Sequence, residues 1–95
     1  MRYLNRVEWI DDRIGDRIME IDRDRAESIV SSDLKKRYPD IERLEFTHAR
    51  FSEILKEWWV MGWFLTESGS IRFFSYTLDA ETGWIKEYTI AIIKL

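Results

Sequence analysis

The sequence predicts an α+β domain in which one or two N-terminal helices pack on a four-stranded antiparallel sheet. The chain has 95 residues, which is the size of a single domain. Eleven of its fourteen aromatic residues lie in residues 46–95, and the apolar pattern changes there from helical to strand spacing. No stretch rich in Pro, Gly or Ser separates the two halves. We therefore treat residues 1–95 as one domain, with residues 1–20 as an extension of residues 21–95.

The N-terminal extension carries apolar residues at helical spacing, which predicts a helix over about residues 3–14. These apolar residues are Tyr3, Val7, Ile10, Ile14 and Ile18. Gly15 is a suitable residue to end the helix, and a short strand from Arg17 to Ile21 could follow it. The alternative is a hairpin that folds at Asp11–Asp16.

The clearest helix begins at Asp22 or Asp24, either of which can cap its first turn, and Pro39 stops it. Basic residues Lys35–Arg37 fall in the last turn, where a positive charge is favourable. One face of this helix is apolar and is formed by Ala26, Ile29, Val30, Leu34 and Tyr38. We expect this face to pack on the sheet.

Four segments rich in aromatic and β-branched residues predict the strands. They are residues 43–51, 58–66, 71–79 and 84–93. Residues 67–70 form a short hairpin loop, and the segment 52–57 forms a wider loop or one helical turn. The last turn ends at Gly83, where a type I turn followed by a bulge needs a positive φ.

The last turn and the start of the main helix carry a family resemblance. The turn reads Asp79-Ala80-Glu81-Thr82-Gly83 between two strand segments, and it resembles the C-terminal signature of PepSY domains. Residues 21–29, an apolar residue and a cap followed by Ala26, resemble that family's helix entry. The resemblance covers about residues 21–88. It implies a PepSY/cystatin-like fold and a non-catalytic domain that binds protein, with peptidase inhibition suggested for some members.

The composition argues against several functional classes. The net charge is −3, from 15 basic and 18 acidic residues, whereas a nucleic-acid binder normally carries a basic excess. The absence of cysteine excludes disulfides and thiolate metal sites. No signal-peptide pattern and no apolar run of membrane-spanning length are present, so we expect a cytoplasmic protein that does not bind membranes. The chain has no Gln and a single Asn, which resembles the composition of thermophile proteins.

Catalytic chemistry has little support in the sequence. His48 is the only histidine, and no Gly-x-Ser-x-Gly motif supplies a nucleophile for it. No calcium-loop or phosphate-loop motif is present. We therefore predict that the protein is not an enzyme and has no catalytic residue, metal site or cofactor.

The second strand segment is apolar on both faces. Side chains alternate along a strand, so Trp58, Val60 and Phe64 point to one face. Trp59, Met61, Trp63 and Leu65 point to the other face. One helix covers only one face, so the other needs the N-terminal extension, a second subunit or protein partner, or a ligand. A glycine in the middle of this strand, Gly62, indicates a bulge, a bend or a close approach by another group.

We predict that the protein is a non-catalytic interaction module that binds a protein partner, or itself as a homodimer, through aromatic residues of the sheet. The predicted interaction surface consists of Trp58, Trp59, Trp63, Phe73, Tyr76 and Trp84. The alternative is a small-ligand domain with an aromatic cup, whose polar groups are His48, Arg50 and Arg72.

Overall fold

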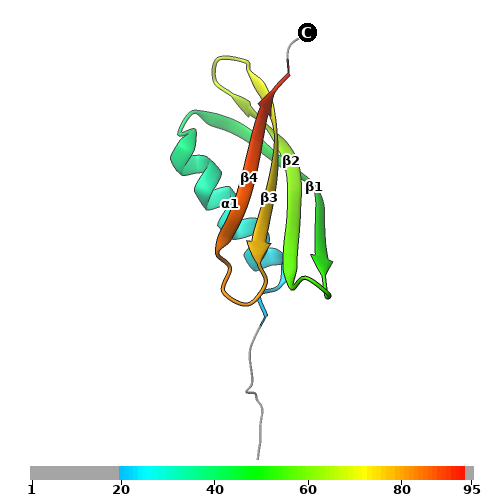
Figure 1. The fold of residues 1–95 in the computed structure, drawn as a ribbon. Coiled ribbons are helices and arrows are strands. Elements are labelled where there is room, and N and C mark those ends of the chain that lie inside the picture. The colour runs from blue at the N-terminus through cyan, green and yellow to red at the C-terminus, as the bar shows by residue number, and fades with distance from the viewer. Residues whose placement is uncertain (1–19, 94–95) are drawn as a thin grey trace, which may run out of the picture.

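The computed structural model describes residues 20–93, in which one helix packs on a four-stranded antiparallel sheet (Figure 1). The elements are α1 (Arg23–Arg37), β1 (Ile41–Ser52), β2 (Glu57–Thr66), β3 (Ile71–Asp79) and β4 (Ile85–Ile92). Each strand pairs with the next along the chain, in the order β1-β2-β3-β4. The predicted α+β class is confirmed, and the strands differ from the predicted segments only at their ends. The predictions for the N-terminal extension, a helix over about residues 3–14 or a hairpin, fall outside the described residues.

Helix α1 begins and ends as its sequence predicts. The Asp22 carboxylate accepts a hydrogen bond of 2.8 Å from the backbone N–H of Arg25, which satisfies one of the free donors of the first turn. At the other end the backbone N–H of Tyr38 donates to the carbonyl of Leu34, and Pro39 follows. These contacts set the two ends of α1.

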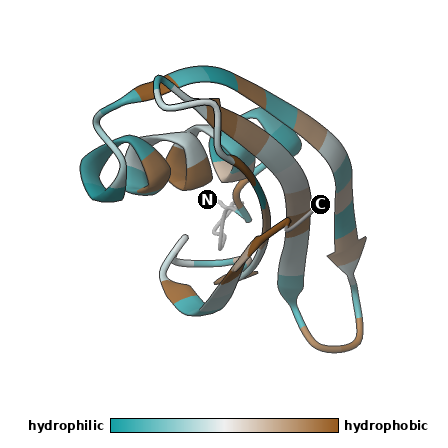
Figure 2. Cartoon of the chain, turned by 90° about the horizontal axis from the view of Figure 1, so that it is seen from above, coloured by the Kyte–Doolittle hydropathy of each residue, from teal (hydrophilic) through white to brown (hydrophobic). Residues whose placement is uncertain are grey.

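The core lies between α1 and one face of the sheet. Figure 2 shows the sheet curving around the helix, so that α1 lies on its concave side. The fully buried apolar side chains of the helix are Ala26, Val30 and Leu34, and those of the strands include Val60, Phe64, Tyr76 and Leu78. The strand residues alternate with residues that point to the convex side, which we call the outer face. Within residues 20–93 the chain therefore has one core, on the side of the sheet that faces α1.

Gly62 lies at a close approach of the β1 backbone to β2. The pairing of β1 with β2 shifts register between Phe46 and His48, beside Gly62. A Cβ atom on Gly62 would lie 2.0 Å from the carbonyl oxygen of Glu45, closer than any real side chain can come. The glycine is therefore required by a bulge and a close backbone approach, two of the predicted alternatives.

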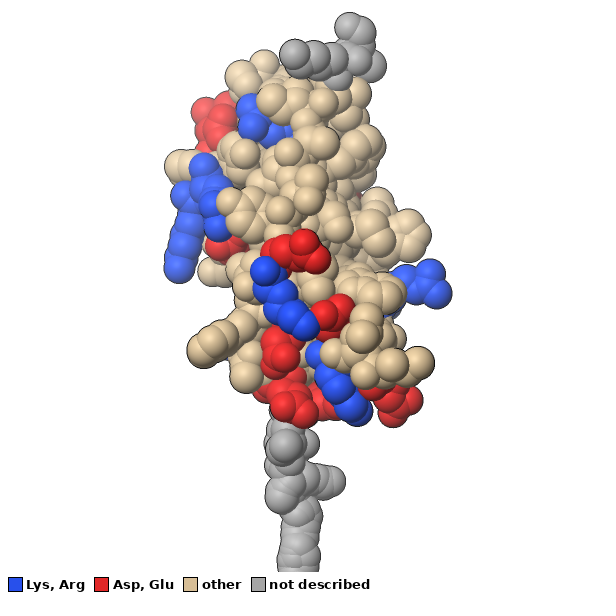
Figure 3. Space-filling model, in the orientation of Figure 1, with Lys and Arg blue, Asp and Glu red and all other residues tan. Residues whose placement is uncertain are grey.

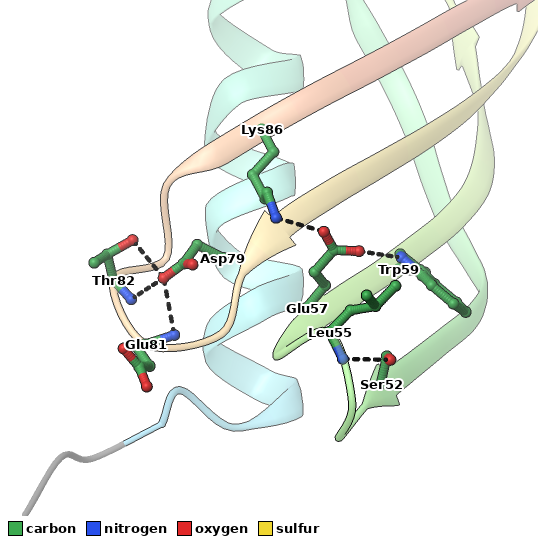
Figure 4. A network of polar contacts seen from close by, with 8 residues as sticks. All are labelled: Ser52, Leu55, Glu57, Trp59, Asp79, Glu81, Thr82 and Lys86. Carbon is green, nitrogen blue, oxygen red and sulfur yellow. Dashed lines mark hydrogen bonds and ion pairs between the residues drawn. The ribbon is translucent and has the colours of Figure 1, made fainter.

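The turn between β3 and β4 is held by one carboxylate. Asp79 Oδ2 accepts hydrogen bonds from the backbone N–H groups of Glu81 and Thr82 and from the Thr82 hydroxyl (Figure 4). Gly83 follows with φ +80°, as predicted, and its N–H donates to the Asp79 carbonyl. The chain then returns as β4 with a register shift beside Leu78.

Candidate functional site

The outer face carries a group of apolar side chains that no element of residues 20–93 covers. We call this group the outer patch; it consists of Trp59, Met61, Trp63, Leu65, Ile71 and Phe73. Trp63 lies directly across from Phe73, and Leu65 lies across from Ile71. Phe73 is 50% exposed and Trp59 is 37% exposed, although both are large hydrophobic residues. Ile71 is also exposed, whereas Met61, Trp63 and Leu65 are half-buried.

The outer patch is shallow and open. A hollow of about 370 Å³ lies between Met61 and Phe73 and extends toward β1 and β4. Phe74 also borders it, and the rest of its lining is small or polar and consists of Thr47, His48, Gly62, Ser75, Thr89 and Ala91. A second hollow of about 260 Å³ is bordered by Trp63, Ile71, Phe73 and Ile93. Phe73 borders both hollows, so it stands between them as the most prominent side chain of the patch.

Charged side chains lie at one end of the outer face. Glu57 joins the indole N–H of Trp59, at 3.0 Å, to the ammonium group of Lys86 (Figure 4). The hydrogen bond from Lys86 has the larger effect and that from Trp59 the smaller one, and both lower the pKa of Glu57. The same hydrogen bond to Glu57 raises the pKa of Lys86. Figure 3 shows charged side chains gathered over the lower part of this face, with a mostly uncharged area above them. An apolar centre beside a charged border is typical of protein interfaces.

The side of the outer patch next to β1 also carries charge. The guanidinium group of Arg43 lies 5.5 Å from the centre of the Trp63 ring and pairs with the Glu45 carboxylate at 3.1 Å. The contact of a cation with an aromatic face is favourable, and it orients the indole ring. Arg43 and Glu45 therefore border the patch without breaking its apolar centre.

The six residues predicted for the interaction surface lie in three places. Trp59, Trp63 and Phe73 lie in the outer patch, where Trp63 is directly across from Phe73 and Met61 lies between the two tryptophans along β2. Trp58 lies on the helix side, where its indole N–H donates to the carbonyl of Ile21 at 3.0 Å. Tyr76 also lies on the helix side and is fully buried. Because side chains alternate along strands, these last two cannot reach the outer patch.

Trp84 is separate from both groups. It is 76% exposed and directly follows Gly83 in the turn between β3 and β4. That turn lies at the opposite end of β3 from Phe73. Trp84 therefore belongs to neither the outer patch nor the core.

The polar residues predicted for a ligand cup do not converge. His48 pairs with Met61 across β1 and β2, and Arg50 pairs with Trp59, so both lie beside the outer patch. Arg72 lies on the helix side of β3, where its guanidinium group stands 4.9 Å from the centre of the Tyr38 ring. Only His48 borders the larger hollow.

A polar contact that the sequence analysis missed lies between the helix and the sheet. The Tyr76 hydroxyl donates to Asp33 Oδ2 at 2.6 Å, and the Nε of Arg37 donates to the same oxygen at 2.7 Å. Arg37 also covers the ring of Tyr88, which stacks on Tyr76. This group ties α1 to β3 and β4.

The charges of this group are fixed by their surroundings. Burial and the hydrogen bond to Asp33 raise the pKa of Tyr76, so its hydroxyl stays protonated. Burial alone would raise the pKa of Asp33, but the hydrogen bonds from Tyr76 and Arg37 outweigh it and lower that pKa. No sequence pattern links residues 33 and 76, because only the fold brings them together. The contact is therefore a structural hydrogen bond between α1 and β3, in which the Tyr76 hydroxyl remains the donor and the Asp33 carboxylate remains the acceptor.

Two kinds of site are absent from the described part of the chain. Within residues 20–93, no three His, Asp or Glu side chains gather to hold a metal ion. Within the same residues, α1 is neither long nor apolar enough to cross a membrane.

Comparisons of the chain with models of protein families, with curated proteins and with solved structures found no match.

Proposed function

We propose that this protein is a non-catalytic protein-interaction module and that the outer patch is its binding surface. The observation that carries the proposal is the exposure of Phe73 and Trp59 on a sheet face that nothing in residues 20–93 covers. Each aromatic side chain can bury roughly 150–250 Å² in a contact. Exposed apolar patches of this kind mark interaction sites in soluble proteins.

The shape and border of the patch favour a protein as the partner. Its hollows are open depressions, whereas a small-molecule site encloses most of its ligand. The ion pair of Glu57 with Lys86 and that of Arg43 with Glu45 provide a polar rim that can orient a partner. The partner is another protein or a second copy of this chain, and the resemblance to PepSY domains makes a peptidase a class to test. The acidic net charge argues against nucleic acid.

Photo-crosslinking from two aromatic positions tests the proposal. A photoreactive phenylalanine analogue replaces Phe73 in one variant and Trp84 in the other, and each variant is irradiated in cells that make the protein. We expect adducts of one defined mass from position 73 and none from position 84, because Trp84 is exposed but lies outside the outer patch. The adduct mass separates a second copy of the chain from a different protein.

The identified partner is then titrated with purified variants. We expect Phe73→Lys to weaken binding by more than about tenfold, because it places a charge in an apolar contact. Trp84→Lys makes the same kind of change outside the patch and serves as the control. Equal adducts at both positions, or equal affinities of the two variants, would contradict the proposal.

A second candidate function is supported by the larger hollow. Hydroxyl groups of Thr47, Ser75 and Thr89 and the ring of His48 border its apolar floor, so it has polar groups to orient a small molecule. Chemical-shift mapping with a small-molecule fragment library tests it. Shifts confined to these four residues would favour the ligand reading, and shifts spread over the face or absent would exclude it.

The remaining proposals follow from composition and from the surroundings of His48. We propose that the protein has no enzymatic activity, because the ring of His48 is exposed and, among the described residues, its Nδ1 contacts only the Thr47 hydroxyl, at 3.2 Å. We propose a cytoplasmic location, since a chain without cysteine needs no oxidising compartment. Fluorescence microscopy of a tagged chain checks the location.

A further inference from the structure

The two edges of the sheet differ in how well they are protected against pairing with another strand. The strand order leaves β1 and β4 at the edges. Strand β1 has register shifts near both Arg43 and His48, and it carries charged or titratable side chains at Glu42, Arg43, Glu45, His48 and Arg50. Bulges and charges are the usual means by which proteins keep an edge from pairing. Edge β1 is therefore protected.

Strand β4 carries charges at Lys86 and Glu87, but its C-terminal part lacks these means of protection. Its segment Tyr88–Ile92 reads Tyr-Thr-Ile-Ala-Ile, with no charged residue, no proline and no glycine. Its pairing with β3 is regular from Glu87 to Ile92, and the register shift lies before that segment. Within residues 20–93, no other strand pairs with the free side of β4. A regular, uncharged edge strand rich in β-branched residues is the kind that pairs with another chain.

The backbone groups that face away from the sheet can be assigned. The N–H of Ile93 donates to the carbonyl of Ile71, so these two residues form a hydrogen-bonded pair. Antiparallel pairs alternate along the strands, so the residues next to this pair direct their N–H and C=O groups to the opposite side. On β4 these residues are Tyr88, Ile90 and Ile92. Their backbone groups point away from β3, and no strand of residues 20–93 pairs with them.

The side chains of the same residues are only partly covered by α1. Tyr88 is 41% exposed and Ile92 is 51% exposed, on the concave side of the sheet. Ile90 between them is half-buried against the core. A further strand beside β4 would remove this apolar surface from water, which is favourable.

We propose that β4 is a self-pairing edge, through which two copies of this chain join antiparallel into one continuous eight-stranded sheet. A twofold axis at Ile90 places this residue opposite its own copy and places Tyr88 opposite Ile92 of the second copy. The outward backbone groups then meet in register and form about six hydrogen bonds. No like charges face one another, because residues 88–92 are uncharged. Because this segment can pair with its own copy in register and without charge repulsion, we propose a second copy of the chain as the partner of this edge.

The proposed pairing is independent of the outer patch and leaves it accessible. The patch lies on β2 and β3 and points to the convex side, whereas the free edge of β4 lies in the plane of the sheet. A strand pair is smaller than the roughly 1,200–2,000 Å² of a standard stable interface. We therefore expect a weak dimer that forms as the concentration rises.

Two measurements on the full chain test the proposal. Sedimentation or light scattering follows the mass from roughly 10 μM to 1 mM, a range suited to weak association. Amide hydrogen exchange is followed by NMR at both ends of this range. We expect a dimer at high concentration, together with slower exchange at the outward amides of Tyr88, Ile90 and Ile92. The inward amides of Thr89 and Ala91 are protected at every concentration, because they already bond to β3.

Two substitutions separate this proposal from the proposed function. Ile92→Lys places a charge beside the free edge at a half-exposed position, and we expect it to raise the dimer dissociation constant by more than about tenfold. Phe73→Lys changes the outer patch and leaves that constant unchanged. The reverse result would place self-association in the outer patch, which overturns the edge proposal and leaves the proposed function standing. If a variant does not fold, the exchange data on the parent chain decide.

Other outcomes are equally decisive. A parent chain that stays monomeric, with fast exchange at the outward amides, overturns the proposal. If those amides become protected only when a different protein is added, edge β4 pairs with that protein and the second copy is excluded as its occupant.

Discussion

Replacing Gly83 by alanine tests the turn that joins β3 and β4, and Gly69 provides a matched control. Both glycines have positive φ, +80° at Gly83 and +88° at Gly69. A Cβ at Gly83 would lie 2.8 Å from the Cδ1 of Ile29 on α1, whereas a Cβ at Gly69 would have no atom within 4 Å. The two substitutions therefore share the backbone cost, and only the change at Gly83 also disturbs the packing of the helix.

The expected magnitudes follow from these geometries. A non-glycine residue at positive φ costs about 1–2 kcal/mol, and alanine recovers roughly 0.4–1 kcal/mol by restricting the unfolded chain. Gly69→Ala is therefore expected to lower the free energy of unfolding by about 1 kcal/mol. At Gly83 the side chain of Ile29 must also move, and overpacking adds about 1 kcal/mol or more. Gly83→Ala is expected to cost about 2 kcal/mol.

Urea unfolding of a double-mutant cycle measures the packing part directly. Ile29→Val removes the Cδ1 atom that the new Cβ would meet. In that background we expect the cost of Gly83→Ala to fall to the cost of Gly69→Ala in the parent chain, because only the backbone cost remains. Equal costs for the two glycine substitutions, with no effect of Ile29→Val, would refute the reasoning.

Three further predictions concern polar side chains. Hydrogen bonds from Thr82 lower the pKa of Asp79 in the folded protein. The ionised Asp79 carboxylate therefore stabilises the fold above about pH 3.9, the pKa of Asp in the unfolded chain, and this stabilisation is lost as the pH falls through the lower pKa of the folded state. Asp79→Asn should therefore flatten the acid side of the stability curve measured by urea unfolding, and an unchanged slope would contradict this. Tyr76→Phe should lower the free energy of unfolding by about 1–3 kcal/mol, because half-buried Asp33 loses a donor; a loss of unfolding free energy no larger than that of a substitution at an exposed position would contradict a stabilising role for this hydrogen bond. His48→Ala should change that free energy by less than about 0.5 kcal/mol and leave any turnover unaffected, and a folded variant that loses turnover would overturn the non-enzymatic assignment.

The fold was largely predictable because its elements are determined locally. The caps of α1, the β-branched and aromatic strands and the turn at Gly83 each depend on residues close in sequence. Alternation along the strands also grouped Trp59 with Trp63 on one face. Local patterns were therefore sufficient for the element order and for placing Trp59 and Trp63 on the same side of the sheet.

The rest of the site could not be predicted because it depends on which face the helix covers. Alternation divides a strand into two sets of side chains, but it does not say which set lies inside. Trp58 and Tyr76 are as aromatic as Trp59 and Phe73, and only the position of α1 makes the first two part of the core. The bond between Tyr76 and Asp33 spans 43 positions of sequence and left no local pattern.

The nearest-neighbour order of the strands has a consequence for how the chain folds. Each hairpin brings together segments adjacent in sequence, so its closure requires only a short loop, and low contact order favours fast folding. The contacts of α1 with the sheet, such as the hydrogen bond from Tyr76 to Asp33, close much longer loops. We expect the hairpins to form before the helix docks. Substitutions in the turn at Gly83 would then mainly slow folding, whereas loss of the Tyr76 hydroxyl would mainly speed unfolding.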